Sequence, residues 1–400
     1  MRNSQHYDVV IIGGAMSGAT LALMLAQAKL RVAVVEQHLP KAHHDGGFDA
    51  RCIALSHGSM QLLNRVRGAQ CSLLGAVRGD LCGIEQIHIS DQGHSGMVTL
   101  EAAKLNLRAL GAVVPLARMG EVLMRFINAQ ENIDYLAPAS VERVDYLADS
   151  VQVTLTDGSQ LDSQLLVAAD GTHSRTARAA GIGLETLSDY GQSAVIANVK
   201  TELPHQHRAF ERFTANGPVA LLPMHDNVMS LVWCERQARA EALMAASEPH
   251  FLSELQRAFG WRLGKLEHVS PRFCYPLKLQ KAQLLHAQRL VLVGNAAQTL
   301  HPIAGQGFNL GLRDIATLAV MLGQAHAQGQ DLGASALLSD YARARENDKT
   351  RIMQLTDSLV SIFANPLLPF AVGRNLGLGW LACNRTLRQH FIKPTLGWAS

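Results

Sequence analysis

A glycine-rich loop between two apolar runs near the amino end constrains the fold of this chain more than any other stretch. Residues 7–12 are rich in Val and Ile, residues 13–18 read Gly-Gly-Ala-Met-Ser-Gly, residues 19–29 have a helical composition, and residues 31–35 form a second apolar run that ends at Glu36. Two parallel strands joined by a helix form a βαβ unit, and a glycine loop at its first turn lets the backbone approach a pyrophosphate. The stretch therefore predicts a Rossmann-like dinucleotide-binding unit.

This unit supplies the first candidate cofactor-binding residues. A carboxylate about 20 residues beyond the glycine loop is placed to accept a hydrogen bond from a ribose hydroxyl. The candidates are Gly13, Gly14, Ala15, Met16, Ser17, Gly18 and Glu36. The loop departs from the usual G-x-G-x-x-G pattern at Ala15, whose methyl group faces the position of the pyrophosphate. We expect this methyl group to weaken dinucleotide binding.

A second glycine loop lies near residue 300. The apolar run 290–293 predicts a buried strand, the spacing of 312–322 predicts a helix, and the polar, glycine-rich stretch 294–311 lies between them. Pro302 restricts the backbone, and glycines such as Gly305 allow a tight path that brings N–H groups close to a flat or anionic ligand. A helix start adds a partial positive charge there. For a glycine loop alone, a structural strand-to-helix turn is the alternative.

A third loop that follows a predicted strand lies between these two glycine loops in the sequence. The run 151–155 and the residues from Gln160 onward predict a hairpin that turns at Asp157 and Gly158. Its second arm leads into a strand-like run at 165–169, which the Asp170-Gly171 pair follows.

Together, the three loops resemble the motifs of the class A flavoprotein aromatic hydroxylases, which share the fold of para-hydroxybenzoate hydroxylase. The first loop is similar to their FAD pyrophosphate motif, Asp170-Gly171 with Ser174 and Arg178 to their central motif, and 294–311 to their third motif. The resemblance spans roughly residues 6 to 350. Shorter segments are similar to the ubiquinone-biosynthesis branch of the class, namely residues 47–55, 88–94, 195–199 and 208–214, together with Asn295 and Gln298.

The resemblance implies further site residues. Pro302, Gly305 and Gln306 belong to the loop that it places at the N1 and C2=O edge of the flavin, with no side-chain base assigned. Arg51 is implied at the diphosphate, since a guanidinium suits phosphate, although a surface salt bridge is the alternative. The other implied FAD-binding residues are Asp170, Gly294, Asn295, Gly307, Phe308 and Asn309. Most of the class has Asp and His where this chain has Asn295 and Gln298, so no proton relay is expected at Gln298.

The resemblance also implies the domain organisation. We expect a mixed α/β (α+β) fold with a Rossmann-like FAD-binding domain, an antiparallel-sheet substrate domain and a helical C-terminal region. The expected segments are 1–79, 102–180 and 281–350 for the FAD-binding domain, 80–101 and 181–280 for the substrate domain, and 351–400 for the helical region. Residues 37–60 are expected to form a loop and then a helix. Strand-like runs with alternating polarity support the sheet, namely 84–88, 97–100, 193–199, 219–222 and 228–233.

The function implied is that of an FAD-dependent monooxygenase, which hydroxylates the ring of a polyprenylated methoxyphenol in ubiquinone biosynthesis. No nucleophile–base motif and no metal-ligand spacing appears in the sequence, so a cofactor must supply the chemistry. In the class, this is FAD with O2 and NAD(P)H, acting through a flavin C4a-hydroperoxide. The alternatives are another ring hydroxylase of the same pathway or fold, and a flavin-poor scaffold subunit of a ubiquinone-biosynthesis complex, which Ala15, Asn295 and Gln298 motivate.

Composition and charge narrow the partners and the location. A net charge of +3 without a Lys/Arg run argues against nucleic acid, and six cysteines without a C-x-x-C pair predict reduced thiols in a cytoplasmic protein. The uncharged stretch 358–373 contains Pro366 and Pro369 and is shorter than the ~18 to 20 residues of a membrane span. The tail 365–400 is expected either to pack on the protein or to form an amphipathic surface for a partner or the inner membrane.

Overall fold

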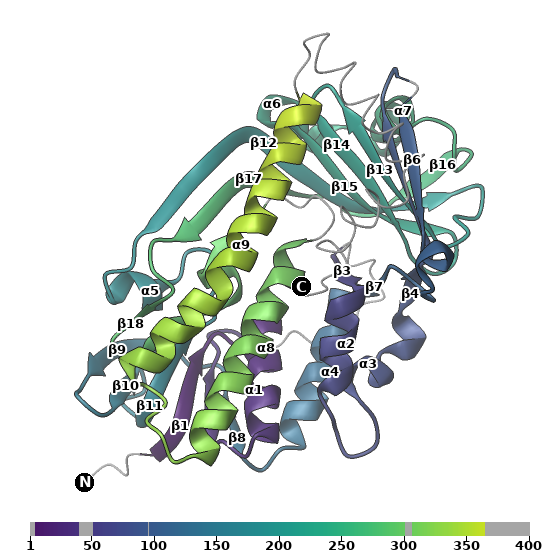
Figure 1. Cartoon of the computed structure of the whole chain (residues 1–400). Helices are drawn as coiled ribbons and strands as arrows, with labels where there is room; N and C mark the ends of the chain where they lie inside the picture. The colour runs from purple at the N-terminus through teal and green to yellow at the C-terminus, as the bar shows by residue number, and fades with distance from the viewer. Residues whose placement is uncertain (1–4, 40–50, 95, 301–305, 365–400) are drawn as a thin grey trace.

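The computed structural model describes residues 5–39, 51–94, 96–300 and 306–364, whose elements form two large layers (Figure 1). One layer is an eight-stranded sheet covered by long helices, and the other is a nine-stranded sheet that lies across its upper end in the view. A three-stranded sheet lies between them. This arrangement confirms the predicted mixed α/β fold.

The eight-stranded sheet has a parallel centre. Its order is β18-β19-β11-β1-β2-β8, and β10 pairs with both β11 and β9. β1, β2, β8, β11 and β19 pair in parallel, whereas β9, β10 and β18 pair antiparallel. The bounds are β1 (Gln5–Ile12), β2 (Val32–Val35), β8 (Ile133–Leu136), β9 (Val141–Tyr146), β10 (Val151–Leu155), β11 (Gln160–Ala168), β18 (His286–Ala287) and β19 (Leu290–Leu292).

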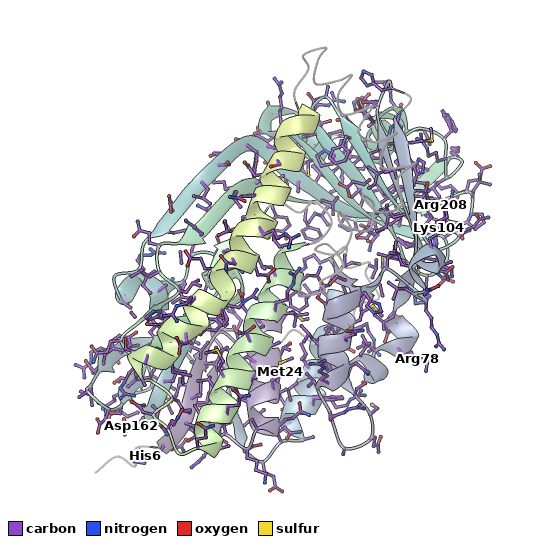
Figure 2. All side chains as sticks on the ribbon, viewed as in Figure 1. His6, Met24, Arg78, Lys104, Asp162 and Arg208 are labelled. Atoms are coloured by element: carbon purple, nitrogen blue, oxygen red, sulfur yellow. The ribbon has the colours of Figure 1, made fainter. Side chains whose placement is uncertain are left out.

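The last residues of three parallel strands lie in register. Ile12 of β1 lies opposite Ala168 of β11, which lies opposite Leu292 of β19. The loops after these strands therefore start side by side at the carboxyl edge of the sheet, where open α/β sheets bind ligands. The opposite edge lies at the lower left of Figure 2, where His6 and Asp162 are labelled as neighbours.

Helices bury one face of this sheet. Val9 and Ile11 of β1 belong to a core shared with the main helices, whereas Val10 and Ile12 point to a second core. The bounds are α1 (Met16–Gln27), α2 (His57–Arg65), α3 (Leu73–Ala76), α4 (Leu116–Asn128), α5 (Arg175–Ala179), α8 (Gln306–Ala327) and α9 (Ser335–Ala364), with 3-10 turns η1 (Arg78–Asp80), η2 (Ala102–Leu105) and η3 (Gly294–Ala296). The predicted helices at 19–29 and 312–322 are confirmed, but both begin earlier, within the glycine loops.

The nine-stranded sheet is mainly antiparallel, with one parallel pair between β13 and β5. Its order is β20-β17-β12-β15-β14-β13-β5-β6, with β16 beside β12. The bounds are β5 (Gln86–Asp91), β6 (Met97–Glu101), β12 (Leu184–Thr201), β13 (Arg208–Thr214), β14 (Gly217–Pro223), β15 (Val228–Arg236), β16 (Leu266–Val269), β17 (Phe273–Ala282) and β20 (Gln298–Thr299). In Figure 2, the labelled Arg208 marks the start of β13 at the outer end of this sheet.

The two faces of this sheet have different neighbours. One face packs on α6 (Gln237–Ala245) and α7 (Glu248–Phe259) through a core that includes Phe210, Trp233 and Phe259. The opposite face, here called the inner face, points toward the rest of the molecule (Figure 1). Strand alternation places on it Ala194, Ile196, Ala209, Glu211, Phe213, Ala220, Leu222, Val232, Cys234, Tyr275 and Leu277.

The three-stranded sheet corrects two predictions. β3 (Cys52–Ser56) lies where only a loop and a helix were expected. It pairs with β7 (Gly111–Pro115), which lies so far along the chain that the local sequence does not indicate the pairing. The expected strand 84–88 is two strands. β4 (Cys82–Ile84) pairs with β7, and the chain then turns at Glu85 into β5 of the nine-stranded sheet. This small sheet thus joins the two proposed domains.

Helix α9 packs apolar residues against the rest of the molecule where its side chains are described. Tyr341 and Ile352 are buried. The side chains of Leu355, Leu359 and Phe363 in the same helix, and the whole tail 365–400, lie outside the part of the chain that the structure describes. Within the described residues, we find no helix with the length and apolar character needed to span a membrane.

Candidate functional site

The three glycine loops meet at the carboxyl edge of the eight-stranded sheet. Gly13 has a left-handed φ of +101°, and a Cβ there would lie 2.5 Å from the carbonyl oxygen of Ala169. Gly294 has φ +60°, and a Cβ there would lie 2.6 Å from Ser17 Oγ. The first loop therefore touches the loop after β11 and the loop after β19. Any larger residue at either glycine would push these loops apart.

One cavity of about 1150 Å³ lies where these loops meet. It exceeds the ~300–1,000 Å³ typical of small-molecule sites, so an extended dinucleotide has room in it. The predicted residues that line it are Gly13, Ala15, Met16, Ser17, Glu36, Asp170, Gly294, Asn295, Gly307 and Phe308. Asn295 is exposed toward this space, on the turn after β19.

Other predicted residues do not line the cavity. Gly14 lies behind it, where a Cβ would collide with the Tyr135 ring, and a Cβ at Gly18 would collide with Gly13. Arg51 is exposed and precedes Cys52, which does line the cavity. Pro302 and Gly305 lie outside the described residues, and of Gln306 only its place as the first residue of α8 is described.

Asn309 holds the cavity wall together. Its side chain is buried, its Oδ1 accepts a hydrogen bond from the Ser56 amide at 2.9 Å, and its Nδ2 donates to the Ala54 carbonyl at 2.9 Å. Both polar groups therefore bind the backbone of β3. Asn309 fixes helix α8 against this strand, and it does not face the cavity.

The first loop presents a helix start and a carboxylate to the cavity. Ala15 is the N-cap residue of α1 and is exposed on the cavity wall, so its methyl group faces open space. Glu36 Oε2 accepts from the Gly14 amide at 2.7 Å, and Oε1 accepts from the His38 amide at 3.0 Å. These bonds hold the carboxylate at the end of β2, beside the positive end of the helix.

Tyr135 completes this part of the site and was missed from the sequence. Its hydroxyl donates to the Gly14 carbonyl at 3.2 Å, and its ring packs against the same glycine. Burial, with the nearby Glu36 carboxylate, raises the pKa of Tyr135 to about 12, so the hydroxyl keeps its proton. The sequence offers no motif around this residue that would have indicated the contact.

Asp170 offers an unpaired acceptor. Its Oδ2 accepts from the Thr176 amide at 3.2 Å and from Thr176 Oγ1 at 3.0 Å. Its Oδ1 is buried and has no hydrogen-bond partner among the described residues. Because buried carboxylate oxygens are almost always paired, this atom fits the hydroxyl group of a bound molecule.

These features fit FAD. The glycines form a cradle that a side chain would fill, the helix start of α1 suits a pyrophosphate, and Glu36 and Asp170 supply acceptors for hydroxyl groups. Gly307 and Phe308, at the start of α8, are the residues by which this end of the third loop lines the cavity.

Gln298 belongs to a buried polar network beneath this loop. Its Nε2 donates to Asp314 Oδ2 at 2.9 Å. Asp314 is fully buried, and it also pairs with Arg345 Nε at 2.7 Å and with Lys349 Nζ at 3.0 Å. Gln298 therefore joins the third loop to α8 and α9. The sequence indicated Gln298 as a departure from the class, but it did not indicate these partners.

Comparison with known proteins agrees with this geometry. The profile of the FAD binding domain family matches residues 6–356. Ubiquinone hydroxylase UbiL of Rhodospirillum rubrum is 37% identical over 390 residues, which cover 98% of this chain and 89% of that protein. The 3-demethoxyubiquinol 3-hydroxylase of Escherichia coli is 31% identical over 399 residues, covering 98% of this chain and 99% of that protein. Para-nitrophenol 4-monooxygenase PnpA of Pseudomonas putida shares the fold, with a TM-score of 0.80 and 17% identity over 99% of this chain and 100% of that one.

Proposed function

The chain belongs to the FAD binding domain family and is an FAD-dependent aromatic monooxygenase, and we propose that it hydroxylates the ring of a polyprenylated methoxyphenol in ubiquinone biosynthesis. In this reaction, a ring C–H becomes C–OH. One oxygen atom of O2 enters the product and the other leaves as water, with two electrons from NAD(P)H. FAD, when bound and reduced, supplies the activation of O2.

The protein's own residues position FAD in this proposal. Gly13 and Ser17 hold the first loop open for the pyrophosphate, Glu36 and Asp170 accept from hydroxyl groups, and Asn295 faces the ribityl side. We further propose that Pro302, Gly305 and Gln306 lie along the flavin edge, where backbone N–H groups stabilise negative charge. Their neighbours Gly307 and Phe308 line the cavity, which supports this placement.

The observation that carries the proposal is that the cavity and the inner face of the nine-stranded sheet share a wall. Cys52 of β3 lines the cavity, and its Sγ lies 3.5 Å from Met224 Sδ, just beyond β14. A ring held beneath the inner face would therefore lie beside the flavin site, away from bulk water.

The apolar inner face also suits a prenyl chain. Tyr275 lies on this face and is 43% exposed, and Phe273, two residues before it, is 38% exposed. Because alternate residues of a strand share a face, Phe273 and Tyr275 expose apolar surface side by side on β17, and a prenyl chain could cover it. Because a long prenyl substrate resides in a membrane, we propose that the protein works at the cytoplasmic side of the inner membrane, together with other proteins of the pathway.

Loss of the protein tests this function in cells. We expect cells that lack it to accumulate a prenylated methoxyphenol and to lose ubiquinone during aerobic growth, as measured by mass spectrometry of lipid extracts. Reintroducing the intact chain should restore ubiquinone. Unchanged ubiquinone with no accumulated phenol would exclude this substrate, whereas accumulation of a different ring intermediate would move the proposal to another hydroxylation of the pathway.

A further inference from the structure

The reaction needs a group that binds the phenolic hydroxyl and accepts its proton. The loop residues described above fit FAD, so this group has to come from another part of the protein. We propose that Glu211, on β13, is this group; the inference rests on the function proposed above. Its position, its surroundings and its unpaired oxygen support this role.

The direction of the Glu211 side chain follows from its neighbour. Phe210 packs in the core with α6 and α7, and its ring lies edge-to-face on Phe259 with 5.3 Å between centroids. Successive residues of a strand point to opposite faces, so Glu211 points to the inner face. In Figure 1, α6 and α7 lie on the upper side of β13, and β3 and β7 lie on its lower side.

The inner face at this point adjoins the FAD cavity. Ala209, two residues before Glu211 on the same face, packs with Ile84 and Val113 of the three-stranded sheet. Cys52 packs against this same cluster and also lines the cavity. The path from Glu211 to the cavity wall therefore runs along the inner face of β13 to Ala209 and then across the three-stranded sheet to Cys52.

Glu211 is surrounded by apolar side chains, some of them small. The strand register places Ala220 of β14 on one side of it and Ile89 of β5 on the other. Ala209 and Phe213 flank it along β13. Two of these neighbours are alanines, whose side chains are the smallest after glycine. We place the aromatic ring of the substrate over them, with its hydroxyl directed at Glu211.

One oxygen of the carboxylate lacks a partner among the described residues. This atom, Oε1, is also shut off from solvent. Buried polar atoms of this kind are rare unless a ligand or water pairs with them. Burial raises the pKa of Glu211 to about 7, close to the value at which a general base works best at neutral pH. The Cys234 thiol shares this face, and burial together with the Glu211 charge raises its pKa, so it stays protonated.

The proposed step is balanced and involves no oxidation. The O–H bond of the phenol breaks, its electron pair stays on the phenol oxygen, and a new O–H bond forms on a Glu211 carboxylate oxygen. The resulting phenolate is a stronger carbon nucleophile toward an electrophilic oxygen derived from O2, whose activation bound FAD would supply. The hydroxylated ring then releases its C–H proton to solvent and becomes aromatic again, and the phenol oxygen takes back the proton held by Glu211, so the carboxylate is regenerated.

The test uses the FAD-loaded protein, reduced chemically without oxygen and then mixed with O2 and a short-chain prenyl methoxyphenol, so that no electron donor has to be known. We expect Glu211→Gln to lower the rate of hydroxylation at least ~100-fold, with FAD retained. The matched control is Glu235→Gln. Glu235 is a buried carboxylate on β15 of the same sheet, but it points to the helix-covered face, and its Oε1 lies 3.3 Å from Arg239 Nε. The hydroxylation rate of Glu235→Gln should therefore stay within a factor of about two of the wild-type rate.

A more acidic phenol separates a proton acceptor from a merely structural residue. A ring-fluorinated analogue loses its proton more easily, so the ratio of wild-type to Glu211→Gln rates should shrink to below about tenfold; effects of fluorine on the ring itself cancel in this ratio. If Glu211→Gln does not retain FAD, Glu211→Asp replaces it. That variant keeps a carboxylate but shortens its reach, so hydroxylation should fall about tenfold with FAD binding unchanged.

The outcomes distinguish this inference from the function on which it rests. A wild-type protein that hydroxylates the phenol, with a Glu211→Gln variant equally active or with a rate ratio that is the same for both phenols, overturns the role of Glu211 alone. A wild-type protein that gives no hydroxylated product with either phenol overturns the proposed function itself.

Discussion

The methyl group of Ala15 lies on the cavity wall where the first loop would approach the FAD pyrophosphate. We expect Ala15→Gly to tighten FAD binding about tenfold, which corresponds to about 1.4 kcal/mol. Glycine is also acceptable at this position because Ala15 caps α1 without a side-chain hydrogen bond. Titration of the FAD-free protein, followed by flavin fluorescence, measures the change.

Ala19→Gly is the control for this prediction. Ala19 lies in the same helix and is 2% exposed, so the substitution weakens the helix by about 1 kcal/mol without changing the cavity wall. Its FAD affinity should match that of the wild type. An Ala15→Gly protein with unaltered affinity would mean that the loop accommodates the methyl group, and that Ala15 has no bearing on flavin retention.

Single residues were predictable where one backbone position allows few residue types. Gly13 and Gly294 were found because loops that pack this closely need glycine, and the structure places both at contacts between loops. Tyr135 and Glu211 were not found. Tyr135 contacts Gly14, which lies 121 residues away in the chain, so no local pattern indicates the contact. The importance of Glu211 depends on which face of β13 it occupies, and the sequence around it does not show which face is covered by helices.

The elements around the third loop depend on a buried ion cluster between α8 and α9. Asp314 is fully buried and pairs with Arg345 and Lys349, and burial lowers the pKa of Lys349. Asp314→Asn leaves these cations without their shared carboxylate. We expect a loss of about 3 kcal/mol in the free energy of unfolding, because removing one partner of a buried ion pair leaves uncompensated charge. Urea denaturation of the FAD-free protein measures it.

The same substitution on the surface of α9 provides the comparison. Asp340 pairs with Arg343 at 3.0 Å, but both side chains are largely exposed, so Asp340→Asn should cost less than about 1 kcal/mol. Similar denaturation midpoints for the two variants would show that the buried cluster does not stabilise the packing of α8 on α9.

Elements with strong periodic patterns were predictable, and short ones were not. β1, β19 and α8 follow apolar runs, and the structure confirms all three, although α8 begins before the predicted residue 312. β3 has only five residues and gains its stability from pairing with β7 far along the chain, so its sequence resembled a loop. The split between β4 and β5 was hidden for the same reason, because only Glu85 separates the two strands, although they pair with different sheets.

In the whole molecule, the eight-stranded and nine-stranded sheets contribute different parts of the site, and they adjoin at the three-stranded sheet. The parallel sheet presents three loops that fit FAD, and the nine-stranded sheet covers them with an apolar face (Figure 1). The order of strands and loops along the chain allowed the fold and the cofactor to be predicted, because the three motifs lie at the ends of strands. The relative placement of the two layers depends on long-range packing, so the position of the substrate site could only be taken from the resemblance.

Isotope tracing of the oxygen atom tests the whole account most directly. The FAD-loaded protein is reduced, mixed with a short-chain prenyl methoxyphenol under ¹⁸O2, and the product is analysed by mass spectrometry. We predict a product that carries one ¹⁸O atom in a new ring hydroxyl. Oxidation of the flavin that yields only hydrogen peroxide, or a product whose new oxygen comes from water, would contradict it.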